Sequence, residues 1–330
     1  MAGLTLRQPR ATSSRLAAGP WRSYTVRRLF GAVLVLIGVA IATFLLLHAA
    51  PGNPAEQVLG QRATPAQLHA LEHKWGLDAS LPSQFWRYAK KVLHGDLGTS
   101  LVYGKSVTSL VGPRVGQTAL LVAIAVLFAI VMAVPLATLA ASRRNSAADQ
   151  AVRGFSVIGL GLPSFWFGIV LIEIFAVHLN LLPVGGYGSG VGGHLEALIL
   201  PGITAALAIV PLLIRSLRVG MLEVLDADFV AAARGNGLRE PRVLFHVARN
   251  AAVPTVTLLG LNIAYLIGST VIVEQVFALN GVGQLLLQSI QNRDFPMVQG
   301  ITLLLAAAVV IVNLLTDLLA ARLDPRIRLR

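Results

Sequence analysis

Long apolar runs dominate the sequence, and its charged positions fall mainly between them. The first run, residues 29–50, holds 22 residues without a formal charge. As a helix rising about 1.5 Å per residue it would extend roughly 33 Å, enough to cross the hydrocarbon core of a bilayer. Five more runs are long enough, so the pattern predicts six membrane-spanning segments. The other five are residues 117–141, 154–177, 195–214, 255–276 and 298–320.

The predicted fold class is all-α. Backbone groups that face lipid must bond within their own segment, so the spans are expected to be helices, and the alternating short segments of a β-barrel do not occur. A cleaved signal peptide is the alternative for the first run, because Arg27 and Arg28 precede it, but the run exceeds the usual apolar core of such peptides. We expect a retained span. Pro163 and Pro211 should kink or break the runs that contain them.

Two connections between the runs are long. Residues 51–116 are expected to fold as a small cap, with helices at Pro65–Trp75 and residues 83–93 separated by a stretch rich in helix breakers. Residues 215–254 form a loop far longer than neighbouring helices require. Length of this kind suggests that each connection has a task beyond joining two spans.

The basic residues predict the orientation of the chain, because lysine and arginine near spans are retained on the cytoplasmic side. Nineteen of the 27 lysine and arginine residues lie in four segments. These are residues 1–28, the connection between the second and third runs, residues 215–254 and residues 321–330. We therefore expect both termini and the 215–254 loop to be cytoplasmic, with residues 51–116 outside. Residues 1–28 form a basic tail that is expected to be disordered, and residues 117–320 hold the remaining spans.

Composition excludes a water-soluble enzyme. The chain is 55% hydrophobic and only 13% charged, whereas soluble domains carry about a quarter charged residues. The absence of cysteine excludes disulfides, thiolate metal sites and a cysteine nucleophile. The net charge of +12 could suggest nucleic-acid binding, but the basic residues bracket the apolar runs and form no continuous stripe. A membrane protein with the bilayer as its surroundings, and no nucleic acid as partner, is the better interpretation.

Residues 98–106 come nearest to a nucleotide-binding P-loop. Five residues separate their two glycines where a P-loop has four, and the segment is predicted to lie outside the cell. We expect only a turn at Gly104. Because His48, His178 and His194 show no metal-ligand spacing, we predict no catalytic residue, metal or cofactor on this chain.

The 215–254 loop has the pattern helix, sharp turn, helix. Helical character is continuous over residues 216–234, Gly235-Asn236-Gly237 breaks it, and a second short helix is expected from Glu240 to about Asn250. Consecutive alanines flanked by apolar side chains suit insertion into the groove of a partner, although an amphipathic helix on the membrane surface is the alternative. The candidate docking residues are Asp228, Phe229, Ala231, Ala232, Ala233, Arg234, Gly235, Gly237 and Leu238.

Polar groups within the spans are candidates for a translocation path, because they are costly in lipid. We select Glu173 and Asn262 together with the aromatic Trp166. Glu173 could attract the amino terminus of a peptide or could simply reach water near the outer interface, and both interpretations stay open. Structural roles are expected for three further polar residues, namely Glu274, Asn313 and Asp317.

Several strings occur in an order that resembles one family. The segment Ala231-Ala-Ala-Arg-Gly-Asn-Gly237 is joined by His48-Ala-Ala-Pro-Gly-Asn-Pro54, Trp75-Gly-Leu-Asp78, Gly95-Asp-Leu-Gly-Thr-Ser100, Leu162-Pro-Ser-Phe-Trp-Phe-Gly168, Val273-Glu-Gln-Val-Phe277, Arg293-Asp-Phe-Pro296 and Leu323-Asp-Pro-Arg-Ile-Arg328. Over about residues 24–330 they resemble the B-type permease subunit of dipeptide, oligopeptide and nickel ABC importers. The 231–237 segment resembles that family's EAA loop, with Ala231 where the general motif has glutamate.

The resemblance implies one half of a peptide translocation path in the bacterial cytoplasmic membrane. It also implies a homologous C-type permease subunit, two cytoplasmic ATPase subunits that hold ATP and Mg²⁺, and an extracytoplasmic substrate-binding protein. A nickel-chelate or glutathione permease would share these features. A stand-alone secondary transporter would need coupling-ion groups and usually an internal repeat, and an intramembrane hydrolase would need a base beside Ser164, where no histidine is placed.

Overall fold

The computed structural model describes residues 19–49, 52–60 and 63–323 of the chain. The named elements in these ranges are all helices. One isolated β-bridge pairs Thr99 with Ser106. The predicted all-α fold is confirmed. Of the predicted basic tails, residues 1–18 and 324–330 lie outside the described residues. Residues 19–28 are helical, so the disorder predicted for this part of the N-terminal tail is wrong.

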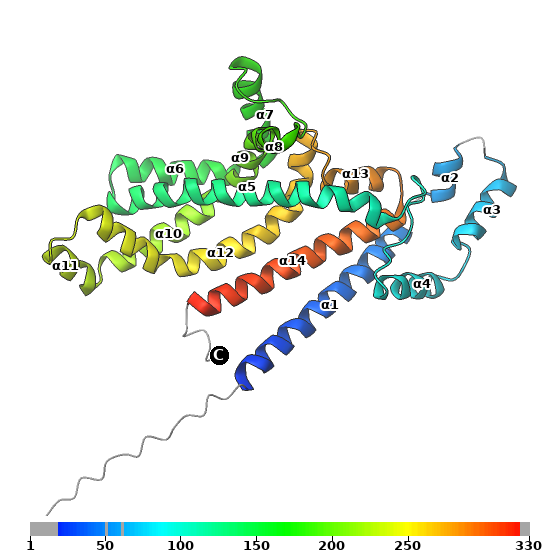
Figure 1. Ribbon diagram of the computed structural model, residues 1–330, viewed down its shortest axis with the longest axis horizontal. Coiled ribbons are helices and arrows are strands. Elements are labelled where there is room, and N and C mark those ends of the chain that lie inside the picture. Colours follow the sequence, from blue (N-terminus) through cyan, green and yellow to red (C-terminus); the bar gives the residue numbers. More distant parts are fainter. Residues whose placement is uncertain (1–18, 50–51, 61–62, 324–330) are drawn as a thin grey trace, which may run out of the picture.

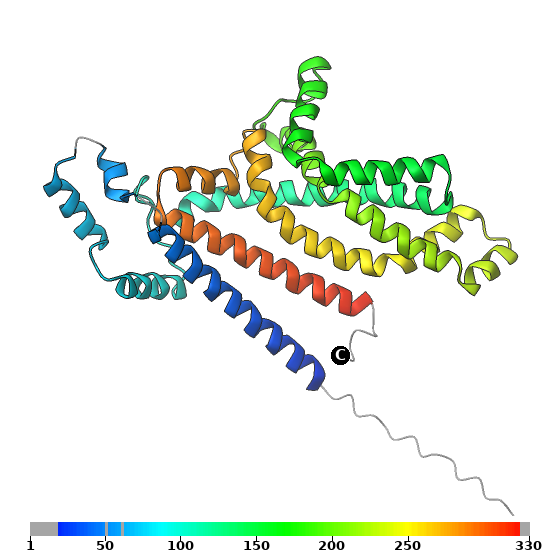
Figure 2. The same ribbon diagram turned by 180° about the vertical axis from the view of Figure 1, so that it is seen from behind.

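The longest helices form an elongated bundle (Figure 1). They are α1 (Gly19–Ala49), α5 (Val107–Ser142), α12 (Glu240–Val276) and α14 (Phe295–Leu323). In both Figure 1 and Figure 2, α1 lies beside α14 at one side of the bundle. By length and hydropathy, the described part holds five helices able to cross a membrane, or up to six when one bent pair is counted as a span.

Small side chains let α5 approach its neighbours α9 (Ile199–Leu207), α10 (Val210–Leu225) and α12 closely. Alanines at positions 125, 129, 133 and 137 recur every four residues, so they share one face of α5, and each is at most 2% exposed. On α9, a Cβ added at Gly202 would lie only 2.6 Å from the Ile124 side chain. Close packing of this kind holds helices together in lipid, where apolar burial alone supplies little driving force.

The predicted third span, residues 154–177, is not one helix. Helix α6 (Ala147–Gly161) is followed by α7 (Ser164–Leu171) and the π-helix η1 (Ile172–His178), and the two parts meet at 107°. Leu162 is extended because the ring of Pro163 disfavours the helical conformation before it. The expected kink or break at Pro163 is therefore confirmed, and the continuous span is wrong. Figures 1 and 2 show α7 projecting from the bundle.

The predicted fourth span, residues 195–214, is also divided. Helix α8 (Gly190–Ala197) and α9 together give the candidate span Gly190–Leu207, and α10 then begins at Val210. Pro211 occupies the first turn of α10, where its missing N–H has no helical partner to lose. The proline thus starts a helix, and the predicted span wrongly crossed the break before it.

The segment after α1 holds the two helices that its sequence predicts. It contains α2 (Pro54–Leu59), α3 (Pro65–Trp75) and α4 (Leu81–Leu93). Helix α3 begins with a capping box between Thr64 and Gln67 and ends at Gly76 in the left-handed conformation. Helix α5 begins ten residues before the predicted second span, and a short helix α13 (Val282–Gln291) precedes α14.

Candidate functional site

Helix α11 (Asp228–Gly235) joins α10 to α12 at one end of the bundle, opposite the end that carries α2–α4 (Figure 1). The continuous helix predicted over residues 216–234 is wrong, because α10 ends at Leu225 and Ala227 is extended before α11 begins. The helix predicted to end near Asn250 is also wrong. It continues through Pro254 as α12, which runs for 37 residues.

A tight turn ends α11, as its glycines predict. Gly237 adopts φ +77°, its N–H donates to the Arg234 carbonyl over 2.9 Å, and the Leu238 N–H donates to the Ala233 carbonyl over 3.1 Å. This is the Schellman pattern, which favours glycine at the left-handed position. Arg234 also donates two hydrogen bonds to the Glu240 carboxylate, at 2.7 and 3.2 Å, and this raises the pKa of Arg234. The turn is thus closed by backbone and side-chain bonds.

One face of α11 is buried and the other is open. Val230 is 1% exposed and belongs to the same buried cluster as Val243 and Val247 of α12. Ala231 and Ala232 are exposed. The remaining candidate docking residues are also exposed, apart from Ala233, which is half-buried; they are Asp228, Phe229, Arg234, Gly235, Gly237 and Leu238.

A third apolar side chain is exposed on the helix that follows α11. Phe245 on α12 is 64% exposed, compared with 45% for Phe229 and 37% for Leu238. It lies within the helix that the sequence predicts from Glu240 to about Asn250, so its helix was predicted but its exposure was not. We call Phe229, Ala231, Ala232, Leu238 and Phe245 the docking surface.

Helices α10 and α12 carry the docking surface as a closely packed pair. A Cβ added at Gly220 of α10 would lie 3.1 Å from the Ala251 carbonyl of α12. Further along, the hydroxyls of Ser216 and Thr255 lie 3.0 Å apart. Little free space therefore separates the two helices at this level.

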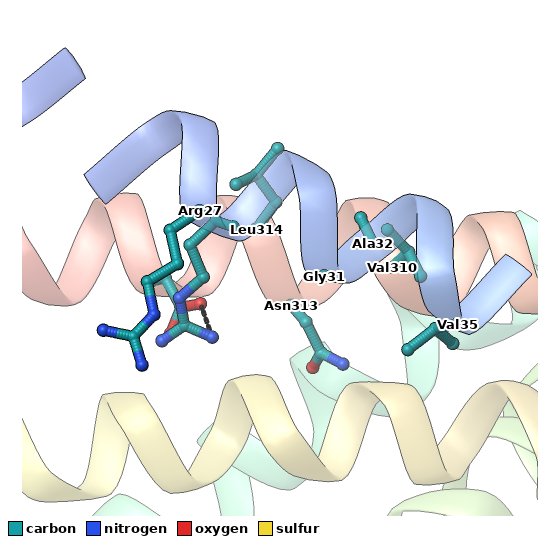
Figure 3. A pocket seen from close by; sticks show the side chains of 9 residues that line it. Arg27, Gly31, Ala32, Val35, Val310, Asn313 and Leu314 are labelled. Atoms are coloured by element: carbon teal, nitrogen blue, oxygen red, sulfur yellow. Dashed lines mark ion pairs between the residues drawn. The ribbon is translucent and has the colours of Figure 1, made fainter. Parts of the chain in front are cut away.

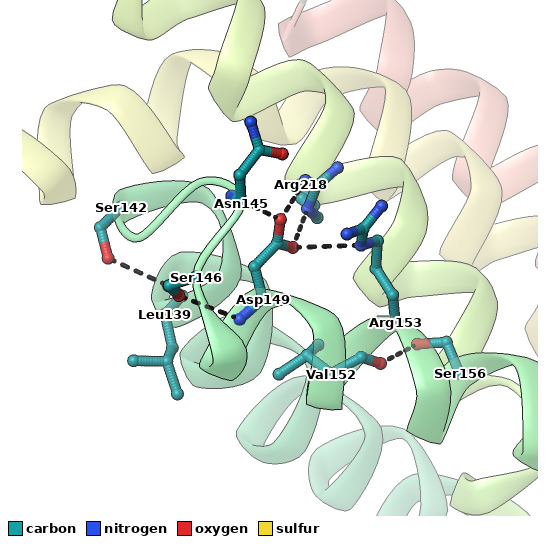
Figure 4. Close-up of polar contacts among 9 residues, drawn as sticks. All are labelled: Leu139, Ser142, Asn145, Ser146, Asp149, Val152, Arg153, Ser156 and Arg218. Carbon is teal, nitrogen blue, oxygen red and sulfur yellow. Dashed lines mark hydrogen bonds and ion pairs between the residues drawn. The ribbon is translucent and has the colours of Figure 1, made fainter.

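A buried ion pair fixes α6 against α10 (Figure 4). The Asp149 carboxylate, fully buried, accepts from Arg218 Nε at 2.7 Å and from Nη2 at 2.8 Å. It also accepts the Asn145 N–H at 3.0 Å, and Arg153 Nε lies 3.7 Å away. The pair joins residues 69 apart in the chain, so no local pattern in the sequence indicated it.

A second buried carboxylate joins three helices. Glu274 of α12 is 1% exposed and accepts from Thr118 Oγ1 of α5 at 2.6 Å and from the Gln284 N–H of α13 at 2.9 Å. Thr118 in turn accepts the Val282 N–H at 2.9 Å. These contacts agree with the structural role expected for Glu274.

The three candidate path residues lie on different elements. Trp166 is on α7 and half exposed, Glu173 is on η1, and Asn262 is nearly buried on α12, where its amide donates to the Leu258 carbonyl at 2.8 Å. Glu173 is mainly exposed beside His178, with 3.4 Å between the carboxylate and Nδ1. In the described part of the chain no hydrogen bond, ion pair or ring contact joins the three residues, so a shared path remains a prediction.

Several of the family-like strings meet at the end opposite the docking surface. A cavity of about 650 Å³ is lined there by His48, Gly76, Asp96, Ser100 and Phe295, among others. The strings also contact one another directly. The Asp294 carboxylate accepts from the Ser100 hydroxyl and from the Leu101 N–H, the latter at 3.1 Å.

Residues 98–106 take part in this junction as a turn. Gly104 has φ +64°, and the Ser100 N–H donates to the Lys105 carbonyl at 2.9 Å. This agrees with the turn expected at Gly104. Among the described residues, no group of three or more histidine, aspartate or glutamate side chains is arranged to hold a metal ion.

Fold and site together define a helical membrane protein with an exposed helix and turn, α11 and residues 236–238, at one end. Residues 133–329 match the family model described as binding-protein-dependent transport system inner membrane component, and residues 22–112 match the model of that component's N-terminal part. The chain belongs to this family.

Individual relatives agree with the family assignment. A probable peptide ABC transporter permease protein of Sinorhizobium fredii is 38% identical over 92% of this chain and 99% of its own length. An oligopeptide transport system permease protein of Bacillus subtilis is 36% identical over 92% of this chain and 99% of its own length. A glutathione transport system permease protein of Pectobacterium atrosepticum is 35% identical over 93% and 99% of the two chains.

A solved structure supports the fold. Inward-facing structures of the MetNI methionine ABC transporter include a chain that matches with a TM-score of 0.53 and 17% identity. The match covers 65% of this chain and 96% of that chain. At this identity the likeness shows the shared fold alone.

Proposed function

We propose that this chain is the permease subunit of an ATP-driven importer of peptides, and that the docking surface couples it to a cytoplasmic ATPase. The family is a transporter permease component, and two of the relatives above are named for peptide or oligopeptide transport. The observation that carries the coupling role is the exposed Ala231–Ala232 backbone of α11, flanked by the apolar side chains of Phe229 and Leu238.

The partners follow from the family rather than from contacts. A binding-protein-dependent component requires a substrate-binding protein, and we assign its approach to the end of the bundle that holds α2–α4. ATP and Mg²⁺ belong on ATPase subunits, of which we expect two. A homologous permease subunit would complete the path, and the projecting α7 offers it an apolar surface that includes Phe165 and Ile169.

The mechanism depends on different docking energies in two states. When the ATPase subunits close on ATP, α11 moves with the groove that holds it. The close contact at Gly220 and the buried Val230 pass this movement to α10 and α12. ATP binding can shift the equilibrium between the two conformations of the spans only by the difference in docking free energy between those conformations.

The test changes one residue of the docking surface and one residue of the turn that follows α11, and leaves the spans unchanged. Ala232→Glu places a charged side chain where the backbone approaches the partner, and Gly237→Val strains a position with φ +77°. Both variants should insert at the parental level and lose ATP-dependent peptide uptake by at least about tenfold, equivalent to about 1.4 kcal/mol. Ala147→Glu is the control, because Ala147 is also an exposed helical alanine but lies on α6.

The same experiment discriminates the alternatives. Uptake that persists in both variants and needs no ATP would favour a stand-alone secondary transporter. Uptake that persists but still consumes ATP would place the coupling contact elsewhere on the chain. A glutathione permease, as one relative is named, would show ATP-dependent uptake of glutathione in preference to other peptides.

A further inference from the structure

A cavity of about 590 Å³ opens between α1 and α14, and it shares no lining residue with the docking surface or with the cavity beside Ser100 and Phe295. Figure 3 shows Arg27 and Asn313, from the two different helices, extending to the same side of this pair. One end of the cavity is charged and the other is apolar. The lining residues are Arg27, Arg28, Gly31, Ala32, Val35, Val310, Asn313, Leu314 and Asp317.

The charged end has an excess of positive charge. Arg28 Nη1 lies 2.9 Å from Asp317 Oδ2, so that carboxylate is already engaged by one arginine. Arg27 adds a second guanidinium to the same lining. Among the described lining residues, two arginines and one aspartate leave a formal charge of +1 at this end of the cavity, which suits an anion.

Asn313 adds a specific chemical requirement. Its Oδ1 atom is buried and has no hydrogen-bond partner within the protein. A buried acceptor without a donor costs free energy. The cavity therefore suits a ligand that carries a hydroxyl or amino donor close to an anionic group.

The apolar end points into the membrane. From Arg28 to Val35 the helix rises about 10 Å, and Gly31 and Ala32 leave space along that face. Only 6% of the apolar stretch of α1 is buried inside the molecule, so this helix faces lipid along most of its length. A molecule that enters this cavity sideways from the bilayer must have a polar head and a long apolar part.

We propose that the cavity binds one anionic phospholipid with a glycerol headgroup, of the phosphatidylglycerol type. Its phosphate pairs with Arg27 and Arg28, a headgroup hydroxyl donates to Asn313 Oδ1, and an acyl chain follows Ala32, Val35 and Val310. Basic pockets between spanning helices recognise anionic lipids in this way. In the orientation proposed above, the site lies in the cytoplasmic leaflet.

The experiment measures lipids on the complete, purified transporter by native mass spectrometry. Phosphatidylglycerol, phosphatidylethanolamine and free glycerol phosphate are added in turn to the delipidated complex. We expect a bound phosphatidylglycerol to be retained in clear preference to phosphatidylethanolamine, and glycerol phosphate not to be retained. Equal retention of the two lipids, or equal retention of the headgroup alone, would overturn the proposal.

Two variants test the named contacts. Arg27→Gln should lower phosphatidylglycerol retention about fivefold, as expected for one basic residue at a lipid surface, and Asn313→Leu should lower it while leaving phosphatidylethanolamine unchanged. Arg144→Gln, at an exposed arginine of the α5–α6 turn, should have no effect. Retention that is equal in Arg27→Gln and Arg144→Gln would contradict a built site.

A cysteine at Ala32 separates lipid from protein as the occupant, because the native chain has no cysteine. In the complete transporter we expect this cysteine to react with a lipid-soluble maleimide more slowly when phosphatidylglycerol is added. Efficient cross-linking of this cysteine to a neighbouring permease subunit would mean that protein fills the cavity, and would overturn the proposal.

Discussion

Asp149 is a single residue on which the packing of α6 against α10 depends. Its carboxylate is fully buried and holds Arg218, which is itself largely buried on α10. Two parallel N–H to oxygen bonds give this pair both strength and a fixed geometry. Because α10 leads directly to α11, the pair sets the position from which the docking surface extends.

Removing one partner of this pair should be more damaging than removing both. Asp149→Ala leaves the Arg218 guanidinium uncompensated in a buried place, so we expect a loss of about 3–5 kcal/mol in the free energy of unfolding. Asp149→Ala combined with Arg218→Met should recover part of that loss. Unfolding of the purified subunit in mixed detergent micelles measures both, with Arg144→Met as the control at an exposed arginine.

A double variant at least as unstable as Asp149→Ala alone would show that the two side chains contribute independently. The ion pair would then have no role in fixing α6 against α10.

The sequence predicted those structural features that depend on residues close together in the chain. Gly237 was predictable, because a left-handed turn after a helix needs glycine and the need is visible within a few residues. Asp149 and Arg218 were not, since 69 residues separate them. Phe245 was missed for a different reason, because it lies within the helix predicted from Glu240, but which face of that helix stays exposed depends on how the helix packs.

At the scale of elements, α10 and α12 act as one support for α11. They pack so closely at Gly220 that any larger side chain must displace the Ala251 backbone. Val230 adds a buried contact at the tip. The support can therefore be tested at a residue of α10 outside α11.

Gly220→Leu should weaken coupling from within the helix pair. Overpacking of a close contact typically costs about 1–3 kcal/mol, and we expect ATP-dependent uptake to fall roughly tenfold while α11 keeps its exposed side chains. Gly112→Leu is the matched control, because a Cβ at Gly112 of α5 meets nothing within 4 Å. Uptake assays on both variants at equal membrane levels provide the measurement.

Normal uptake in Gly220→Leu would show that α11 moves independently of this contact. Equal losses in the two variants would indicate a general effect of leucine on insertion.

The limits of predicting elements are visible at the prolines. Pro163 was expected to kink or break its span, and the local effect of a proline on the residue before it is reliable. The angle of 107° between α6 and α7 depends on how the two helices pack against the rest of the molecule. The sequence of one apolar run does not predict that packing. Pro254 shows the reverse, because α12 continues through a proline that elsewhere would end a helix.

At the scale of the whole molecule, the two ends to which we assign partners are separated by the length of the bundle. Helix α11 lies at one end and α2–α4 at the other (Figure 1). Hydropathy predicted six spans, whereas the described residues hold five helices long and apolar enough to cross a membrane, or six if the bent pair counts as one span. The breaks within the third and fourth runs required the structure. What the fold alone leaves open is which end faces the cytoplasm, and the arginine distribution supplies that prediction.

Reporter fusions test this orientation directly. Alkaline phosphatase, which is active only after export, should be inactive when fused after Ala141 or Gly237 and active when fused after Gly104. Gly104 lies in the turn near the outer junction, and Gly237 ends the docking helix, so the two fusions sample opposite ends of the bundle. The basic residues predict this pattern because positively charged loops resist translocation.

A cytoplasmic reporter fused at the same positions is the control and should give the opposite pattern at each of them. If instead phosphatase is active after Gly237 and inactive after Gly104, the docking surface faces away from ATP. Coupling to a cytoplasmic ATPase through α11 would then be impossible, whatever the substrate.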